Sequence, residues 1–152
     1  MAGALAFSSL MTFAHNTDFE RLPVPSTPWV EMVYAPTMTT FQLWAPTAEK
    51  VRLRLYKDGN EGKAWKTLSL AKGSDGTWAK QMKGDLKGKF YTFEVKVDGK
   101  WRGETPGVNA RAVGVNGKRA AVIDLKDTNP VGWEFDKPTY KLFESGAIYE
   151  MH

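Results

Sequence analysis

The sequence predicts an all-β fold, an antiparallel β-sandwich, and three observations lead to that prediction. Apolar and polar residues alternate with a period of two in several segments. Turn residues separate these segments at roughly the 8–12-residue spacing that is typical of sandwiches. No segment between them shows a convincing helical period, so we place one sandwich at residues 30–127.

The segment before the first strand is broken by prolines. Four of them lie between residues 21 and 36, which disfavours a helix and indicates an extended lead-in over residues 15–29. The segment that follows it, Val30–Tyr34, can join the edge of a sheet.

Two strands with clear alternation come next. The apolar residues that share a face are Phe41, Leu43 and Ala45 in the first, and Val51, Leu53 and Leu55 in the second. Because side chains on a strand point alternately to opposite faces, this pattern predicts half-buried strands. We expect them over Thr39–Ala45 and Val51–Tyr56.

Turn signals mark the remaining strands. Asp-Gly pairs or glycine-rich turns lie near residues 58–59, 73–76 and 98–99. The strands expected between and after these turns are Trp65–Leu70, Thr77–Met82, Phe90–Val97 and Ala120–Leu125.

The two ends of the chain differ in composition from the sandwich. Residues 1–14 are uncharged and rich in Ala, Leu and Phe, so they are interpreted as the remnant of a signal peptide, or alternatively as a short hydrophobic helix. Residues 128–146 read as a linker, and Ile148–His152 has the pattern of the start of a buried strand. A signal remnant would place the protein in the periplasm or outside the cell, and otherwise the cytoplasm is expected.

Composition excludes several function classes. The net charge of +4 comes from lysines interspersed with acidic residues, without a basic run, so nucleic acid is not an expected partner. No apolar segment is long enough to span a membrane. The chain has no cysteine and only two, distant histidines, and its acidic residues show no metal-ligand spacing, so no metal or cofactor is expected.

Aromatic residues are the compositional excess. Six tryptophans, five tyrosines and eight phenylalanines are more than a core of this size needs. Some of these rings are therefore expected on the surface, where a flat apolar face suits a ligand.

Several motifs, taken in order, carry a resemblance to a known family. The run Phe41–Val51, FQLWAPTAEKV, resembles the F-x-L-W-A-P-x-A-x-x-V signature of the N-terminal starch- and glycogen-binding-type module (carbohydrate-binding module 48) of the α-amylase superfamily. The other matching pieces are Gly76–Trp78, Gly88–Phe93, Asn116–Leu125, Asn129–Trp133 and Ile148–His152. The last two look like the linker and first barrel strand of a type I pullulanase.

The resemblance implies an immunoglobulin-like sandwich that precedes a (β/α)₈ catalytic barrel, the latter beginning at about residues 147–152. It also implies hydrolysis of α-1,6-glucosidic bonds of starch, glycogen or pullulan by the parent enzyme. The family's catalytic carboxylates lie on later barrel strands, so none is expected within this sequence, and Glu150 is not a catalytic candidate.

Candidate glucan-binding residues also follow from the resemblance. Val97–Trp101 resembles the V-D-G-x-W hairpin of the glycogen-binding module of the AMP-activated kinase β subunit, and Trp65 lies where that module has its second tryptophan platform. Asn116 and Lys118 loosely match its polar loop, whereas Glu94 stands where that module has a lysine. Trp65 and Trp101 would instead pack on the barrel or cover a sheet edge if the module were purely structural.

Three functions therefore remain open. The first is an accessory module of a pullulanase-like enzyme, with the catalytic barrel as its intramolecular partner. The others are a self-standing α-glucan-binding module and a structural sandwich that packs on a partner domain. Trp44 and Trp78 are expected in the core or between domains, and Trp133 in the linker.

Overall fold

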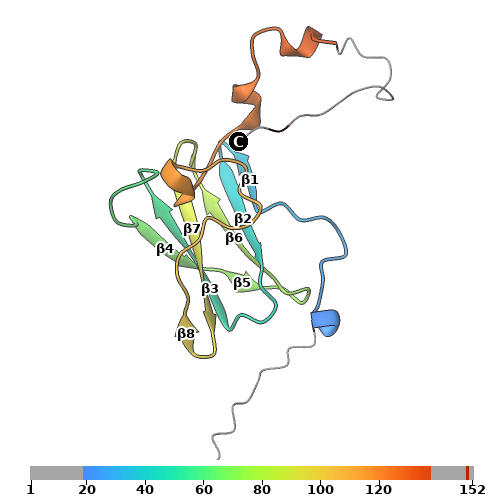
Figure 1. Cartoon of the computed structure of the whole chain (residues 1–152), viewed down its shortest axis with the longest axis vertical. Coiled ribbons are helices and arrows are strands. Elements are labelled where there is room, and N and C mark those ends of the chain that lie inside the picture. The colour runs from blue at the N-terminus through green and yellow to red at the C-terminus, as the bar shows by residue number, and fades with distance from the viewer. Residues whose placement is uncertain (1–18, 138–149, 151–152) are drawn as a thin grey trace, which may run out of the picture.

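The computed structural model describes residues 19–137 and residue 150, and it shows two antiparallel β-sheets packed face to face (Figure 1). One sheet has the strand order β1-β2-β6-β5, and in the other, β4-β3-β7, both β8 and β9 pair with β7. The strands are β1 Met32–Ala35, β2 Met38–Trp44, β3 Lys50–Tyr56, β4 Lys66–Ser69, β5 Ala71–Lys72, β6 Thr77–Lys83, β7 Phe90–Val97, β8 Lys100–Trp101 and β9 Ala120–Ala121. This confirms the all-β sandwich.

Helical structure in the described part of the chain is confined to short 3₁₀ turns. These are η1 Phe19–Arg21, η2 Val115–Gly117, η3 Leu125–Thr128 and η4 Trp133–Phe135. Within the described residues there is accordingly no helix of the length and apolarity that crossing a membrane requires.

The core lies between the two sheets and includes most of the apolar residues that the alternation predicted, while Ala45 is only partly buried. Phe41 from β2 packs its ring edge-on against Tyr91 of β7, and Tyr91 packs in the same way against Phe93, with ring centroids 5.0 and 5.6 Å apart. Other core residues are Leu43, Val51, Leu53, Leu55, Trp78 and Val122. Burial of each such side chain stabilises the fold by about 1.5–3 kcal/mol, so the core is the main source of stability.

The predicted strand Trp65–Leu70 corresponds to β4, and a short strand outside the predicted range, β5, follows it in the other sheet. Residues Lys66–Ser69 form β4 on the edge of β3, whereas Ala71–Lys72 form β5 on the edge of β6. Leu70 marks the crossing, since its amide donates to the carbonyl of Val51 and its side chain is buried between the sheets. The chain therefore changes sheet at the point where an apolar side chain must enter the core.

The last predicted strand, Ala120–Leu125, is wrong from Val122 onward. Only Ala120–Ala121 pair with β7, and the amide of Val122 then donates to the carbonyl of Lys89 outside the ladder. Asp124 accepts a hydrogen bond from the amide of Lys126, which starts the 3₁₀ turn η3. Asp124 thus offers the backbone a local alternative to strand pairing.

The predictions for the ends stay untested. The proposed signal remnant at residues 1–14 and the barrel start at residues 147–152, apart from Glu150, lie outside the described residues. Of the expected linker, residues 128–137 are described and carry η4, in which Trp133 is exposed.

Candidate functional site

The outer face of the β4-β3-β7 sheet is polar and highly ordered by ion pairs. Arg52, Arg54 and Tyr56 alternate along β3 with the buried residues Val51, Leu53 and Leu55. Their partners across the ladder are Glu94 for Arg52, Thr92 for Arg54 and Phe90 for Tyr56. Because directly opposite residues share a face, the strand register places these side chains side by side.

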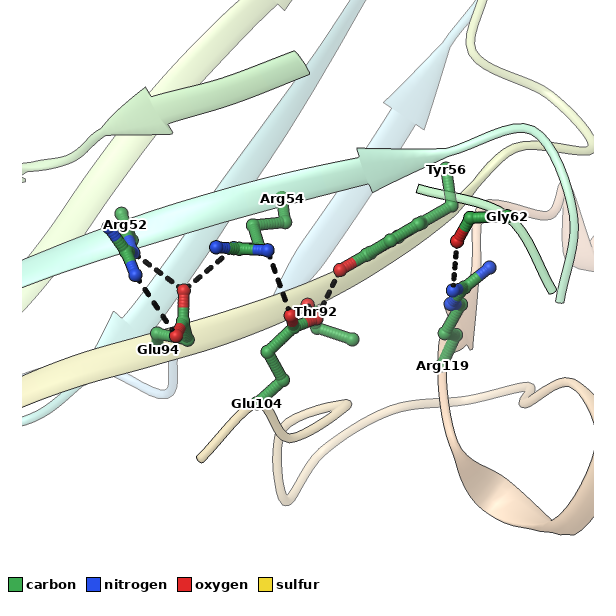
Figure 2. A network of polar contacts seen from close by, with 8 residues as sticks. All are labelled: Arg52, Arg54, Tyr56, Gly62, Thr92, Glu94, Glu104 and Arg119. Atoms are coloured by element: carbon green, nitrogen blue, oxygen red, sulfur yellow. Dashed lines mark hydrogen bonds and ion pairs between the residues drawn. The ribbon is translucent and has the colours of Figure 1, made fainter. Parts of the chain in front are cut away.

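Glu94 holds two arginines on this face. Arg52 donates to it with both Nε and Nη2, at 2.5 and 3.1 Å, and Arg54 donates with Nε at 2.7 Å (Figure 2). Glu94 is only 7% exposed, so its charge would be costly without these partners. The two arginines satisfy it and are in turn fixed in position.

Glu104 continues the network toward the other end of β3. It accepts hydrogen bonds from the Tyr56 hydroxyl and from Thr92 Oγ1, the latter at 2.8 Å, and it pairs with Arg54 Nη1 at 3.0 Å (Figure 2). Although burial alone would raise the pKa of Glu104, the hydrogen bonds from Tyr56 and Thr92 and the charge of Arg54 hold it below its ordinary value. Glu104 is thus kept ionised as an acceptor.

Arg119 closes the network against the loop that follows β3. Its guanidinium lies over the ring of Tyr56, 3.6 Å from the centroid, in a cation–π contact. The same group donates to the carbonyls of Asp58 and Glu61 at 2.6 Å and of Gly62 at 2.8 Å. Arg119 therefore fixes the backbone of residues 58–62 to the edge of the sandwich.

Trp101 lies at the opposite end of the face. It belongs to β8, opposite Lys96 of β7, which itself pairs with Lys50 at the start of β3. The guanidinium of Arg52 lies 4.0 Å from the centroid of the Trp101 ring, and 38% of Trp101 is exposed. The indole is thus held in place on one side and accessible elsewhere, as a platform for a flat apolar ligand would be.

The other predicted site residues lie at the far end of β3. The amide of Trp65 donates to the carbonyl of Leu55, and Trp65 is 43% exposed. Lys118 Nζ donates to the side chain of Asn60 at 3.0 Å, while Asn116 is exposed in η2.

The four predicted residues therefore do not form one cluster. Trp65 and Lys118 lie at the Tyr56 end of β3, whereas Trp101 lies at the Lys50 end. At about 3.3 Å per residue, these ends are roughly 20 Å apart along the strand. A ligand that touches both tryptophans would have to span the face.

The remaining tryptophans have different roles. Trp78 is buried, and its indole N–H donates to the carbonyl of Ala45 at 2.9 Å, as expected for a core position. Of the two places expected for Trp44, the core is excluded, since Trp44 lies exposed on the outside of β2 and donates its indole N–H to the carbonyl of Pro23, and a place between domains stays untested. Trp44 therefore ties the extended lead-in to the sandwich.

The carboxylates of this face have a structural role. Its carboxylates are each paired with arginines or hydroxyls, so they act as structural acceptors. No group of three or more His, Asp or Glu side chains that could hold a metal ion occurs in residues 19–137.

A scan against family models matches residues 29–124 to carbohydrate-binding module 48, the isoamylase N-terminal domain. Among curated proteins, the pullulanase of Bacillus subtilis is 32% identical over 123 residues, which cover 79% of this chain and 16% of that protein. Pullulanase 1 of the Arabidopsis thaliana chloroplast is 28% identical over 129 residues, which cover 78% of this chain and 13% of that enzyme.

Solved structures give the same relationship. The pullulanase of Paenibacillus barengoltzii in complex with maltohexaose and α-cyclodextrin aligns with a TM-score of 0.75 and 41% identity, over 81% of this chain and 19% of that one. The pullulanase of Anoxybacillus sp. LM18-11 aligns with a TM-score of 0.71 and 30% identity, over 86% and 18% respectively. The chain thus spans less than a fifth of the length of these relatives.

Proposed function

This chain belongs to the carbohydrate-binding module 48 family, and on that premise we propose that it is the N-terminal accessory module of a pullulanase-like debranching enzyme. Such an enzyme would hydrolyse the α-1,6-glucosidic bonds of α-glucans, with its catalytic carboxylates in the barrel that follows the module. The module itself would contribute to substrate docking and to the stability of that barrel.

The observation that supports docking is the half-exposed indole of Trp101 on an ordered polar face. The faces of glucose rings are apolar, so they can stack on an indole, while their hydroxyls hydrogen-bond to neighbouring polar groups. Arg52 lies beside Trp101 and is held by its ion pair with Glu94, which lowers the ordering cost of binding.

A second candidate function, packing on a partner domain, is supported by a different surface. An open groove at the edge strand β1 has an apolar part, in which Val33 and Leu125 are exposed, and a charged part. The apolar lining residues are Val30, Met32, Val33, Ile123 and Leu125, and the others are Tyr34, Arg111, Asp124 and Lys126. Apolar surface of this kind is typical of interfaces. The two functions are compatible, since the groove and Trp101 belong to different sheets.

Calorimetry with β-cyclodextrin tests the docking function. We expect weak binding by the 152-residue chain, loss of the heat signal in Trp101→Ala, and an unchanged signal in Trp133→Ala, a control at an exposed tryptophan in η4. An absence of heat from the wild-type chain at millimolar ligand would contradict docking and favour the packing role. In that case Val33→Asp should lower the thermal stability of the intact enzyme.

A further inference from the structure

The strand β1 lies at the edge of its sheet and differs from the other edge strands (Figure 1). β4, β5 and β8 each carry a lysine, at Lys66, Lys72 and Lys100, whereas β1 has the uncharged sequence MVYA. A lysine on an edge strand opposes pairing with further strands, so its absence indicates an edge that can pair. We propose that β1 accepts an additional strand, supplied by an extended segment of the parent enzyme. The proposal rests on the packing function above and specifies how the partner domain docks.

The backbone of β1 offers hydrogen-bonding groups at its free edge. The amide of Gln42 in β2 donates to the carbonyl of Glu31, and bonded pairs alternate along an antiparallel ladder. Met32 and Tyr34 lie at the positions between the bonded pairs, so their N–H and C=O groups point away from β2. Within residues 19–137, no backbone group bonds to them on that side. An incoming strand would satisfy these groups, as it does when a peptide extends a sheet.

A groove of about 380 Å³ runs along this edge and gives the incoming strand a second contact. β1 forms one side of the groove, and Ile123 and Leu125, which follow β9 of the other sheet, belong to the opposite side. A strand added to β1 would direct every second side chain toward that other sheet. Those side chains would cover Leu125, which is 43% exposed. The incoming strand is therefore expected to carry apolar residues at alternate positions.

The charged groups of the groove favour a carboxylate on the incoming strand. Arg111 and Lys126 are both exposed, and neither forms an ion pair with another residue of the described part of the chain. Asp124, the acidic residue of the groove, already accepts a hydrogen bond from the amide of Lys126. An Asp or Glu on the incoming strand would pair with one of the two cations.

The same charges argue against a second copy of this chain as the occupant. β1 has no charged residue to offer, and two grooves brought edge to edge would place the cations of one copy beside those of the other. The chain spans less than a fifth of the length of its pullulanase relatives, so a parent enzyme of that kind has ample further polypeptide. The occupant is thus a segment of that polypeptide with alternate apolar residues and an Asp or Glu.

Hydrogen exchange tests the proposal, measured at single amides on the 152-residue chain and on the full-length polypeptide of the same gene. We expect the amides of Met32 and Tyr34 to exchange about tenfold more slowly, or slower still, in the full-length polypeptide. The amide of Val33 faces β2 in both forms and should change little. Equal exchange of Met32 and Tyr34 in the two forms would overturn strand addition.

Pullulan hydrolysis by the full-length polypeptide tests the proposed function separately. Hydrolysis without protection of Met32 and Tyr34 would overturn strand addition and leave the debranching function intact. Protection without hydrolysis would support strand addition and contradict the debranching function. If protection appeared in the 152-residue chain as its concentration rose, a second copy would be the occupant, and the proposal would be wrong.

Charge variants of the full-length polypeptide test the chemistry of the incoming strand. Arg111→Glu combined with Lys126→Glu should speed exchange at Met32 and Tyr34 about tenfold, because the carboxylate would then meet like charges. Both side chains are exposed, so the fold of the module should persist. Lys66→Glu, on the exposed edge strand β4, is the matched control and should leave this exchange unchanged. Wild-type protection in the double variant would refute an acidic occupant.

Discussion

Glu31 provides the sharpest test of how the sandwich is stabilised. Its side chain is 1% exposed and accepts hydrogen bonds from the Tyr91 hydroxyl and from the amide of Asn109, both at 2.9 Å. Tyr91 is at the centre of the core, whereas Asn109 belongs to the exposed connection between β8 and η2. Glu31 therefore fastens that connection to the core.

We expect Glu31→Ala to destabilise the fold by about 2–3 kcal/mol. Removal of the carboxylate leaves the buried Tyr91 hydroxyl without an acceptor, at a cost of about 1–3 kcal/mol, while the amide of Asn109 can be rehydrated. For a domain of this size, the melting temperature should fall by roughly 10 °C. Glu31→Gln keeps the volume and one acceptor oxygen, so it should cost about 1 kcal/mol or less at neutral pH.

The pH dependence of the folding stability reports on the carboxyl group of Glu31. Burial raises the pKa of Glu31 above its ordinary value of 4.5, although the hydrogen bonds from Asn109 and Tyr91 oppose that shift. Between 4.5 and the raised pKa, the folded chain holds a proton that the unfolded chain has released. Relative to Glu31→Gln, the wild type should therefore lose stability as the pH rises through this window.

Urea unfolding gives the free energies of unfolding of the wild type and of both variants, and it is measured from about pH 3 to about pH 8. If Glu31 titrated in the folded chain as an exposed carboxyl does, the difference in free energy of unfolding between the wild type and Glu31→Gln would be constant across that range. That result, or a loss below about 0.5 kcal/mol in Glu31→Ala, would refute the reasoning.

Three further outcomes follow from other contacts. Gly107→Ala should destabilise the fold by about 2 kcal/mol in thermal unfolding, because Gly107 has a φ of 80° and an added Cβ would overlap the Glu31 carboxylate; wild-type stability would contradict this. Arg119→Ala should lower the free energy of unfolding by about 1–2 kcal/mol and speed hydrogen exchange of the amides in residues 57–63. Lys57→Ala is the control. Unchanged exchange in Arg119→Ala would count against the carbonyl contacts. Trp44→Phe should release the Pro23 contact and make the lead-in more sensitive to protease without lowering core stability, whereas a core defect would show that Trp44 packs inside.

Much of the fold could be predicted from local pattern. The alternation in residues 39–45 and 51–56 is a direct consequence of one face packing inward, and the structure buries Phe41, Leu53 and Leu55 completely. The pattern could not reveal the division of residues 65–72 between two sheets, since pairing partners are distant in the sequence. Nor could it reveal that strand pairing stops at Ala121 and that Asp124 caps the 3₁₀ turn η3.

The candidate site was only partly accessible to sequence reasoning. The hairpin motif predicts Trp101 at the surface, and its exposure agrees with that role. Glu94 was recognised only as a departure from the related module, and its two arginine partners become evident from the register of β3 and β7. Arginines at alternate positions opposite a glutamate indicate such a network, but this signal can be used only when the pairing of the strands is known.

A crystal structure of the chain with maltohexaose or α-cyclodextrin tests the central claim most directly. On this account, the outer face of the β4-β3-β7 sheet binds α-glucan through Trp101. We predict a glucose ring stacked on the Trp101 indole, with Arg52 within hydrogen-bond distance of its hydroxyls. Sugar bound on the opposite sheet, with Trp101 left uncovered, would contradict the claim.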